Sequence, residues 1–176
     1  MINTKKIFIA DDDIFTSAIF KQHLHNLGYD DVTCFSDGTS CLNQLTEKPG
    51  IILLDHQMDD LNGFEVLKKI KRFDPNIYVV MVSGQEDMTT AIDSLKYGAF
   101  DYIIKGTDTT DKITKVLYRI GEIHQLIINK KNKPLQKLAN LFSNAKSKIY
   151  TLFRYYLIIR FMQNPKPISL FSRKRK

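Results

Sequence analysis

Short apolar runs alternate with longer amphipathic segments through residues 7–127. The runs hold four or five residues and are rich in isoleucine and valine, which is typical of strands buried on both faces of a sheet. They are IFIA (7–10), VTCF (32–35), IILL (51–54), YVVMV (78–82) and DYIIK (101–105). The pattern therefore predicts five short strands.

The segments between the runs carry apolar residues at the three- and four-residue spacing of helices. Gly28 and Gly98 follow two of these segments, and glycine is favoured just after a helix end. The apolar positions are Phe15, Ile19, Phe20, Leu24 and Leu27; Phe64, Leu67 and Ile70; Met88, Ala91, Ile92 and Leu95; and Ile113, Val116, Leu117, Ile120, Ile123 and Ile127. The last segment is the most regular of the predicted helices.

Alternation of strand and helix predicts an α/β fold of the doubly wound kind, with a five-stranded parallel sheet covered on both faces. Parallel strands need crossover connections, and helices usually supply them. Ligands of such sheets bind beyond the carboxyl ends of the strands. Candidate chemistry is therefore sought in the residues that follow each strand.

The net charge of +7 conceals two segments of opposite sign. Residues 1–122 hold all 19 acidic residues and 13 basic ones, a net charge of −6, whereas residues 123–176 hold 13 basic residues and no acidic one. The chain is long enough for one domain with a real core and an appendage. The two segments are expected to have different roles.

The cysteines and the N-terminus indicate a cytosolic protein. Cys34 and Cys41 lack the spacing of a zinc site, and we expect both to be reduced thiols that are buried or half-buried. MINTKKIFIADDD has too few apolar residues before its acids for an export signal. No run approaches the roughly 20 apolar residues of a membrane-spanning helix.

Polar residues follow four of the five predicted strands. Asp11 and Asp12 follow the first, Asp55 the third and Ser83 the fourth, and Lys105 lies at the end of the fifth. On a parallel sheet these side chains would gather at one edge as an acid cluster, a hydroxyl and an ammonium. Because neighbouring carboxylates repel, such a cluster predicts a bound cation.

In this order and spacing, the motifs IFIADDD, IILLDHQMDDLNG, VVMVSG and GAFDYIIKG resemble those of the response regulator receiver family. The resemblance covers residues 5 to 128 and implies a receiver domain over residues 1–128, with the flavodoxin-like strand order 2-1-3-4-5. The sequence adds a linker over residues 129–134 and a basic helical extension over residues 135–176.

The resemblance implies that Asp55 accepts a phosphoryl group from a phosphohistidine. The donor would be a histidine kinase or a histidine phosphotransfer protein. The implied cofactor is Mg²⁺, bound directly by Asp12 and Asp55, through water by Asp11, and by the backbone carbonyl of Gln57. Magnesium suits such a site because it prefers oxygen ligands and keeps several waters.

The resemblance also implies a switch. Lys105 would contact the phosphoryl group, Ser83 would donate a hydrogen bond to it, and Tyr102 would turn its ring as the loop after the fourth strand moves inward. This describes a signalling domain that is phosphorylated and slowly dephosphorylated, not an enzyme that turns over a substrate. The downstream partner, the phosphoryl lifetime and homodimer formation stay open.

Two departures from the family pattern keep a second interpretation open. Gly106 follows Lys105 where the family usually has proline, and Asp59 stands where proline is frequent. An interaction module that keeps the fold without phosphorylation, a pseudo-receiver, is the alternative. The retained acids, hydroxyl and lysine favour the phosphoacceptor.

Several neighbouring residues receive structural interpretations. Asp13 is expected to face solvent or cap a helix, and His56 to lie at the rim of the site. Met58 is expected to fill a gap in the core, Gly63 to form a helix-start turn, and Phe64 to lie in the core.

The basic extension over residues 135–176 is predicted to be an amphipathic helix with lysines between its apolar positions. Contact with an anionic membrane surface, which would place the protein at the inner face of the membrane, is one interpretation. Nucleic-acid binding is ranked lower because no helix-turn-helix pattern is found. Packing against the first segment or a second copy is the third.

Overall fold

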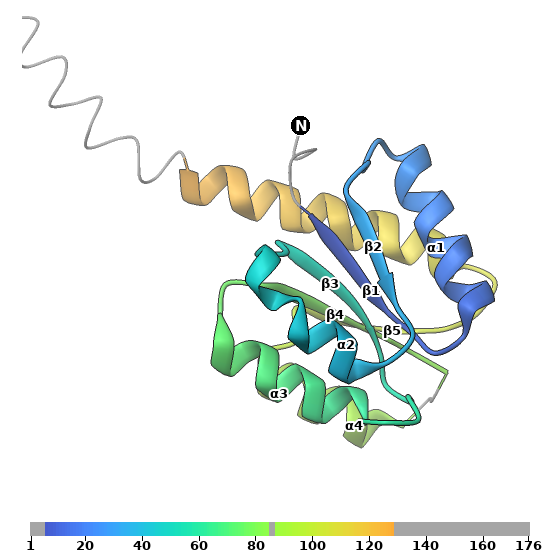
Figure 1. Cartoon of the computed structure of the whole chain (residues 1–176). Helices are drawn as coiled ribbons and strands as arrows, with labels where there is room; N and C mark the ends of the chain where they lie inside the picture. Colours follow the sequence, from blue (N-terminus) through green and yellow to red (C-terminus); the bar gives the residue numbers. More distant parts are fainter. Residues whose placement is uncertain (1–5, 85–86, 129–176) are drawn as a thin grey trace, which may run out of the picture. The chain divides into compact units, whose positions relative to one another are not determined.

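The computed structural model of the chain describes residues 6–84 and 87–128. Its elements are β1 (Ile7–Ala10), α1 (Ile14–Asn26), β2 (Val32–Phe35), α2 (Gly38–Asn43), the 3₁₀ turn η1 (Leu45–Glu47), β3 (Ile51–Asp55), α3 (Gly63–Phe73), β4 (Tyr78–Ser83), α4 (Met88–Lys96) and β5 (Asp101–Ile104). A final helix occupies residues 109–128 (Figure 1). The five predicted strands are confirmed, although the fifth ends just before Lys105.

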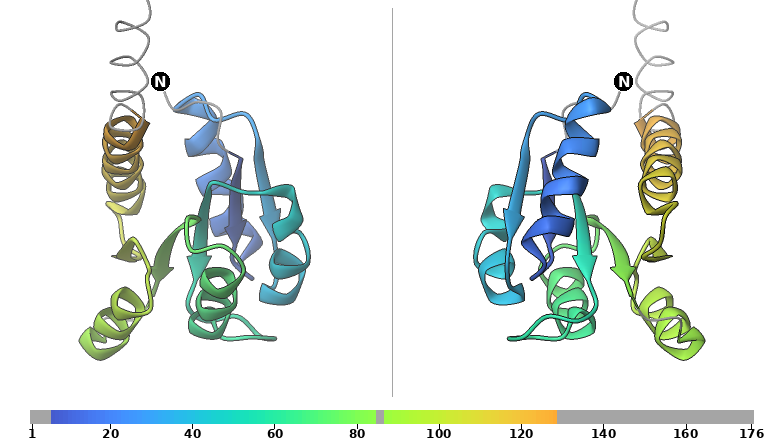
Figure 2. Two further views of the ribbon diagram at one scale, coloured as in Figure 1. Left: turned by 90° about the vertical axis from the view of Figure 1, so that its left-hand side faces the viewer. Right: turned by 90° about the vertical axis from the view of Figure 1, so that its right-hand side faces the viewer.

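The five strands form one parallel sheet in the order β2-β1-β3-β4-β5. This confirms the doubly wound fold and the flavodoxin-like order 2-1-3-4-5. The central strand β3 pairs with β1 through Leu54 and Ala10, and with β4 through Asp55 and Val82. The carboxyl ends of the strands therefore meet at one edge of the sheet (Figure 2).

Successive residues of each strand point to opposite faces of the sheet and build two hydrophobic cores. Ile7 and Ile9 of β1 belong to the core that α1 and the final helix cover. Phe8 and Ala10 belong to the opposite core, which is closed by α2 and α3. Full burial of a large apolar side chain contributes about 1.5–3 kcal/mol, so these two layers hold the strand ends in place.

The expectation that every strand is buried on both faces is wrong for the two edge strands. β1 and β3 are buried throughout, whereas only one residue of β2 and one of β5 are buried. An edge strand has a neighbour on one side only. Helical spacing predicted where the helices lie, but it did not predict which of their residues are buried. Phe15 in α1 is 73% exposed and Met88 in α4 is 75% exposed.

The ends of α1 agree with the sequence. Asp13 is exposed and caps the helix, since its carboxylate accepts the backbone N–H of Phe15 at 3.0 Å. Gly28 follows the helix with a φ of 84°, a conformation that glycine adopts without strain. Cys34 is half-buried, Cys41 is buried, and both are free thiols, as expected.

The predicted linker over residues 129–134 and the extension over residues 135–176 lie outside the described residues. Within the described ranges, no helix is long and apolar enough to cross a membrane.

Gly63 begins α3 and lies against the backbone at the end of β3. Its N–H donates to the carbonyl oxygen of His56 at 2.8 Å. A Cβ atom at this position would overlap the carbonyl oxygen of Asp55 and lie 2.8 Å from the Cα of His56. The position of Gly63 at the helix start was predicted correctly. Glycine is needed here because the backbone of Asp55 and His56 leaves no room for a Cβ atom.

Gly63→Ala is expected to lower the free energy of unfolding by about 2 kcal/mol or more, because the backbone around Asp55 must move to admit a methyl group. Urea denaturation measures the change. Gly84→Ala is the control, since a Cβ there meets nothing within 4 Å. Equal stability of the two variants would contradict the steric explanation.

Asp60 joins the β3–α3 loop to the start of α2. Its carboxylate accepts the backbone N–H groups of Gly38 at 3.0 Å and Thr39 at 2.9 Å. The side-chain hydrogen bond with Thr39 and these backbone donors hold the pKa of the exposed Asp60 well below its ordinary value, against an opposing effect of desolvation. The charged form of Asp60 therefore stabilises the fold.

Asp60→Ala is expected to cost about 1 kcal/mol of stability at neutral pH, as for a lost helix cap. Since the pKa of Asp60 is lower in the folded protein, its contribution is complete above the ordinary pKa of 3.8 and is lost as the pH falls below that value. The free energies of unfolding of parent and variant, measured by denaturation from pH 7 to pH 3, should differ by a constant amount at first and by less as the pH approaches 3. Asp59→Ala is the matched control; a difference that grows in acid would contradict the assignment.

Candidate functional site

The predicted site residues come together at the carboxyl edge of the sheet. Asp11 and Asp12 directly follow β1, Asp55 and Ser83 are the last residues of β3 and β4, and Lys105 follows β5. The strand register fixes their neighbourhood, because each stands at or just beyond the last paired position of its strand.

Lys105 lies between two buried carboxylates. Its Nζ atom is 2.9 Å from Asp11 Oδ2 and 3.1 Å from Asp55 Oδ1. The Asp11 and Asp55 side chains are 2% and 6% exposed, whereas that of Lys105 is 25% exposed. One ammonium thus neutralises part of the charge of two acids that come from different strands.

The electrostatic environment differs among these groups. Burial raises the pKa of Asp11, against the opposing effect of Lys105. Burial alone would lower the pKa of Lys105, but Asp11 and Asp55 outweigh it and raise that pKa. Lys105 is therefore a fixed positive charge at neutral pH.

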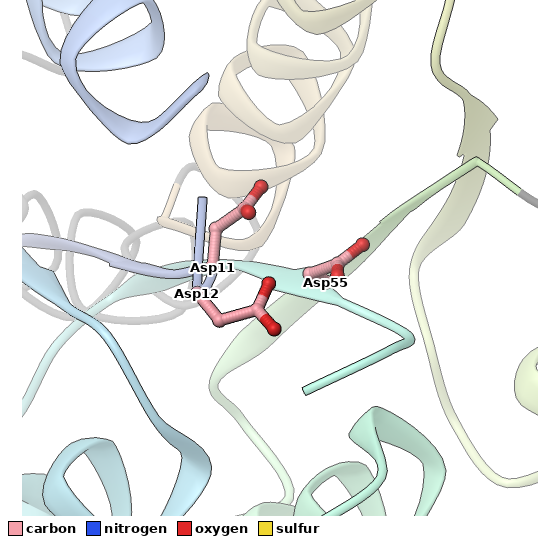
Figure 3. A group of neighbouring side chains, drawn as sticks. All are labelled: Asp11, Asp12 and Asp55. Atoms are coloured by element: carbon pink, nitrogen blue, oxygen red, sulfur yellow. The ribbon is translucent and has the colours of Figure 1, made fainter. Parts of the chain in front are cut away.

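Asp11, Asp12 and Asp55 form a group able to hold a cation. One carboxylate oxygen from each lies within 4.8 Å of the others. Figure 3 shows Asp11 and Asp12 extending from the end of β1 beside Asp55. Asp11 Oδ1 accepts the backbone N–H of Asp13 at 3.1 Å, whereas the buried Oδ2 has the ion pair with Lys105 but, within the part of the chain that the structure describes, no hydrogen-bond donor in suitable geometry.

An open cavity of about 730 Å³ lies over this edge of the sheet. Its lining combines strand-end residues with the β3–α3 loop and consists of Asp12, Asp55, His56, Gln57, Met58, Asp59, Asn62, Gly84 and Lys105. Asp55 is thus buried among protein atoms yet borders a space that a small molecule or a side chain can enter. Gln57 is exposed and borders the same space.

Ser83 and Tyr102 occupy the strands next to Lys105. Ser83 is fully buried, and its carbonyl oxygen accepts the backbone N–H of Lys105 at 2.7 Å. Tyr102 is half-buried and packs against the core closed by α2 and α3. The ends of β4 and β5 are therefore joined directly beside the acid cluster.

His56 borders the cavity beside Asp55, which agrees with a position at the rim of the site. It is half-buried and lines the cavity, and its buried Nδ1 atom has no hydrogen-bond partner among the described residues. Met58 is buried in the core and Phe64 is partly buried against it, which agrees with the structural interpretations of both. The hydrogen bonds of Asp60 to the start of α2 were not predicted from the sequence, although aspartates in loops often accept hydrogen bonds from nearby backbone N–H groups.

The sequence matches the profile of the response regulator receiver domain over residues 7–117. A curated relative, transcriptional regulatory protein ZraR of Klebsiella oxytoca, is 37% identical over 103 residues, which are 58% of this chain and 23% of that protein. The chain thus spans about a quarter of the length of this relative, and the match includes only part of either protein.

Solved structures have the same fold. A CheY-like response regulator receiver domain protein from Methanospirillum hungatei JF-1 is 28% identical, with a TM-score of 0.63 over 69% of this chain and 97% of that one. A chain of the CheX-CheY-BeF3-Mg²⁺ complex from Borrelia burgdorferi is similar, at 26% identity and a TM-score of 0.61, over 66% of this chain and 88% of the matched chain.

Receiver domains are signalling domains, and phosphorylation-based switching by histidine kinases is a property of the family. The strand order, the acid cluster at the sheet edge and the match over residues 7–117 lead to one conclusion: this chain belongs to the response regulator receiver domain family.

Proposed function

We propose that this protein is a response regulator whose Asp55 accepts a phosphoryl group in the presence of Mg²⁺. The observation that carries the proposal is the position of Lys105 Nζ, which contacts both Asp11 and Asp55 beside an open cavity. An acceptor carboxylate, a cation site and a fixed positive charge are the components that phosphoryl transfer requires.

Asp55 supplies the nucleophile. One of its carboxylate oxygens attacks the phosphorus of a phosphohistidine, a P–O bond forms, and the P–N bond of the donor breaks. The electron pair of the broken bond stays on the imidazole nitrogen of the donor. A histidine kinase or a histidine phosphotransfer protein is the proposed partner, and the open cavity leaves room for its side chain.

The acid cluster fits a magnesium ion. Among the described residues, buried Asp11 Oδ2 has the ion pair with Lys105 but no hydrogen-bond donor in suitable geometry, and the three carboxylates offer oxygen ligands. Asp11, Asp12, Asp55 and the backbone carbonyl of Gln57 would hold the ion, Asp11 through a water molecule. Bound Mg²⁺ supplies neutralisation of the negative charge on the transferred oxygens.

Lys105 stabilises both states of the acceptor. Before transfer its ammonium pairs with the Asp55 carboxylate at 3.1 Å. After transfer it pairs with a phosphoryl oxygen, so the positive charge stays at the site while its partner changes.

The readout is proposed to pass through Ser83 and Tyr102. The Ser83 hydroxyl donates a hydrogen bond to the phosphoryl group, which draws the loop after β4 inward; residues 85 and 86 of this loop lie outside the described residues. Tyr102 then turns its ring and alters the surface of α4 and β5. Support for this coupling comes from the backbone hydrogen bond between Lys105 and Ser83, at 2.7 Å, which joins the two strand ends.

Incubation of the parent protein with acetyl phosphate and Mg²⁺, followed by intact-mass spectrometry, tests the proposal. A single phosphoryl adduct is expected for the parent, none for Asp55→Asn, and much less without Mg²⁺, because the substituted side chain lacks the nucleophilic carboxylate and the uncompensated charges repel the donor. Asp59→Asn, which alters another acid of the same cavity, should be labelled as well as the parent.

Labelling of Asp55→Asn at the parental level would refute the assignment of the acceptor. A folded parent that neither acetyl phosphate nor a phosphorylated histidine kinase labels would instead favour the pseudo-receiver.

A further inference from the structure

The loop after β5 begins with Lys105 and contains a glycine where the receiver family usually has proline. The described residues contain no cis peptide bond. Gly106 is exposed, and a Cβ atom there would meet only Asp108 Oδ1, at 3.6 Å. Neither a proline ring nor steric crowding therefore sets the path of the chain beyond Lys105.

Thr109 closes this loop through its side chain. The Thr109 hydroxyl accepts the N–H of Gly106 at 2.6 Å and donates to the carbonyl oxygen of the same residue at 2.7 Å. The backbone N–H of Thr109 also donates to that carbonyl oxygen, at 3.3 Å. A hydroxyl group can make both bonds at once, since it carries one donor and two acceptor positions.

Thr109 is placed to keep these bonds. Only 6% of it is exposed, so little water competes for its hydroxyl. Both backbone polar groups of Gly106 are held by a buried side chain at the start of the final helix. The loop is thus anchored to the helix that covers one face of the sheet.

The consequence concerns Lys105. Its backbone N–H is held by the carbonyl oxygen of Ser83 at 2.7 Å, and the next residue in the chain is held by Thr109. The backbone of Lys105 is therefore held on both sides, and its side chain starts from a defined point to reach Asp11 and Asp55.

We propose that Thr109 is a positioning residue for Lys105 and that, together with Gly106, it replaces the proline that usually shapes this loop. The inference rests on the proposed function, because Lys105 acts there on the phosphoryl group. The bond from the Gly106 N–H cannot form with proline, which has no backbone donor. Any residue with a backbone N–H could make this bond, so the requirement at position 106 is a residue other than proline, and Thr109 supplies the hydroxyl.

A contribution to folding alone is the competing explanation. In that case loss of the hydroxyl would lower stability, but the folded protein would place Lys105 as before. The two explanations differ in the rate of phosphoryl transfer below the melting temperature, and in the surroundings of the Lys105 ammonium.

Phosphorylation rates of the full chain, measured with acetyl phosphate and Mg²⁺ below the melting temperature of every variant, test the proposal. Thr109→Val replaces the hydroxyl by a methyl group. Thr109→Ala removes the hydroxyl and puts nothing in its place. Both should be slower than the parent by roughly tenfold, as for the loss of about one hydrogen bond in the placement of Lys105. Thr109→Ser keeps the hydroxyl and should restore most of the rate.

Two controls match these variants. Thr110→Val makes the same change one residue later, at a half-buried position. The carbonyl oxygen of Thr110 accepts a hydrogen bond from the Thr114 hydroxyl, and the substitution leaves this bond in place. Thr110→Val should therefore be phosphorylated like the parent. Gly106→Ala keeps the N–H and has room for its methyl group, so it should also match the parent.

NMR signals of the Lys105 side chain give a readout that needs no phosphorylation. They should shift in Thr109→Val and Thr109→Ala, but not in Thr109→Ser or Thr110→Val. Parental rates without the hydroxyl, an equal defect in Thr109→Ser, or unshifted Lys105 signals would each overturn the inference. A parent that takes no phosphoryl group would contradict the proposed function, and the NMR comparison alone would then decide the role of Thr109.

Discussion

The ammonium of Lys105, held between the buried carboxylates of Asp11 and Asp55, is the interaction on which the arrangement of the strand ends depends. Two carboxylates 4 Å apart repel by about 4 kcal/mol at an effective dielectric near 20. Their burial adds a desolvation cost that is tolerated only when each charge is paired. One lysine from a third strand end meets this requirement, and a cation beside Asp12 would add to it.

The fold serves this interaction by bringing distant segments of the chain to one edge. Parallel strands all end on the same side, so an acid that follows β1 and an acid at the end of β3 meet a lysine that follows β5. The two cores fix the strands from both faces, and close backbone packing at Gly63 fixes the loop beyond Asp55. Rigid support and an open cavity together suit the proposed role of Asp55, whose carboxylate attacks the phosphorus of an incoming phosphodonor.

Patterns along the chain predicted the strands, and the resemblance to the receiver family implied their order. The structure brings the proposed site residues together at one edge of the sheet, whereas their roles stay predictions. Apolar runs mark strands, and the acids, serine and lysine stand at strand ends. The sequence did not predict Asp60 or Thr109, because their hydrogen bonds depend on how loops cross in space. Nor could helical spacing alone foresee the exposure of Phe15 and Met88, since burial depends on what covers a helix.

The most direct test of this account is the unfolding free energy of Lys105→Met, with and without Mg²⁺, beside Lys112→Met, which removes an exposed lysine paired with Asp108. Without Mg²⁺, Lys105→Met should be less stable than the parent by on the order of 3 kcal/mol, since Asp11 and Asp55 lose their buried counterion. Mg²⁺ should stabilise Lys105→Met more than it stabilises the parent or Lys112→Met. Equal stability of the two variants without Mg²⁺, or the same gain from Mg²⁺ in every protein, would contradict the claim that these two acids depend on a shared positive charge.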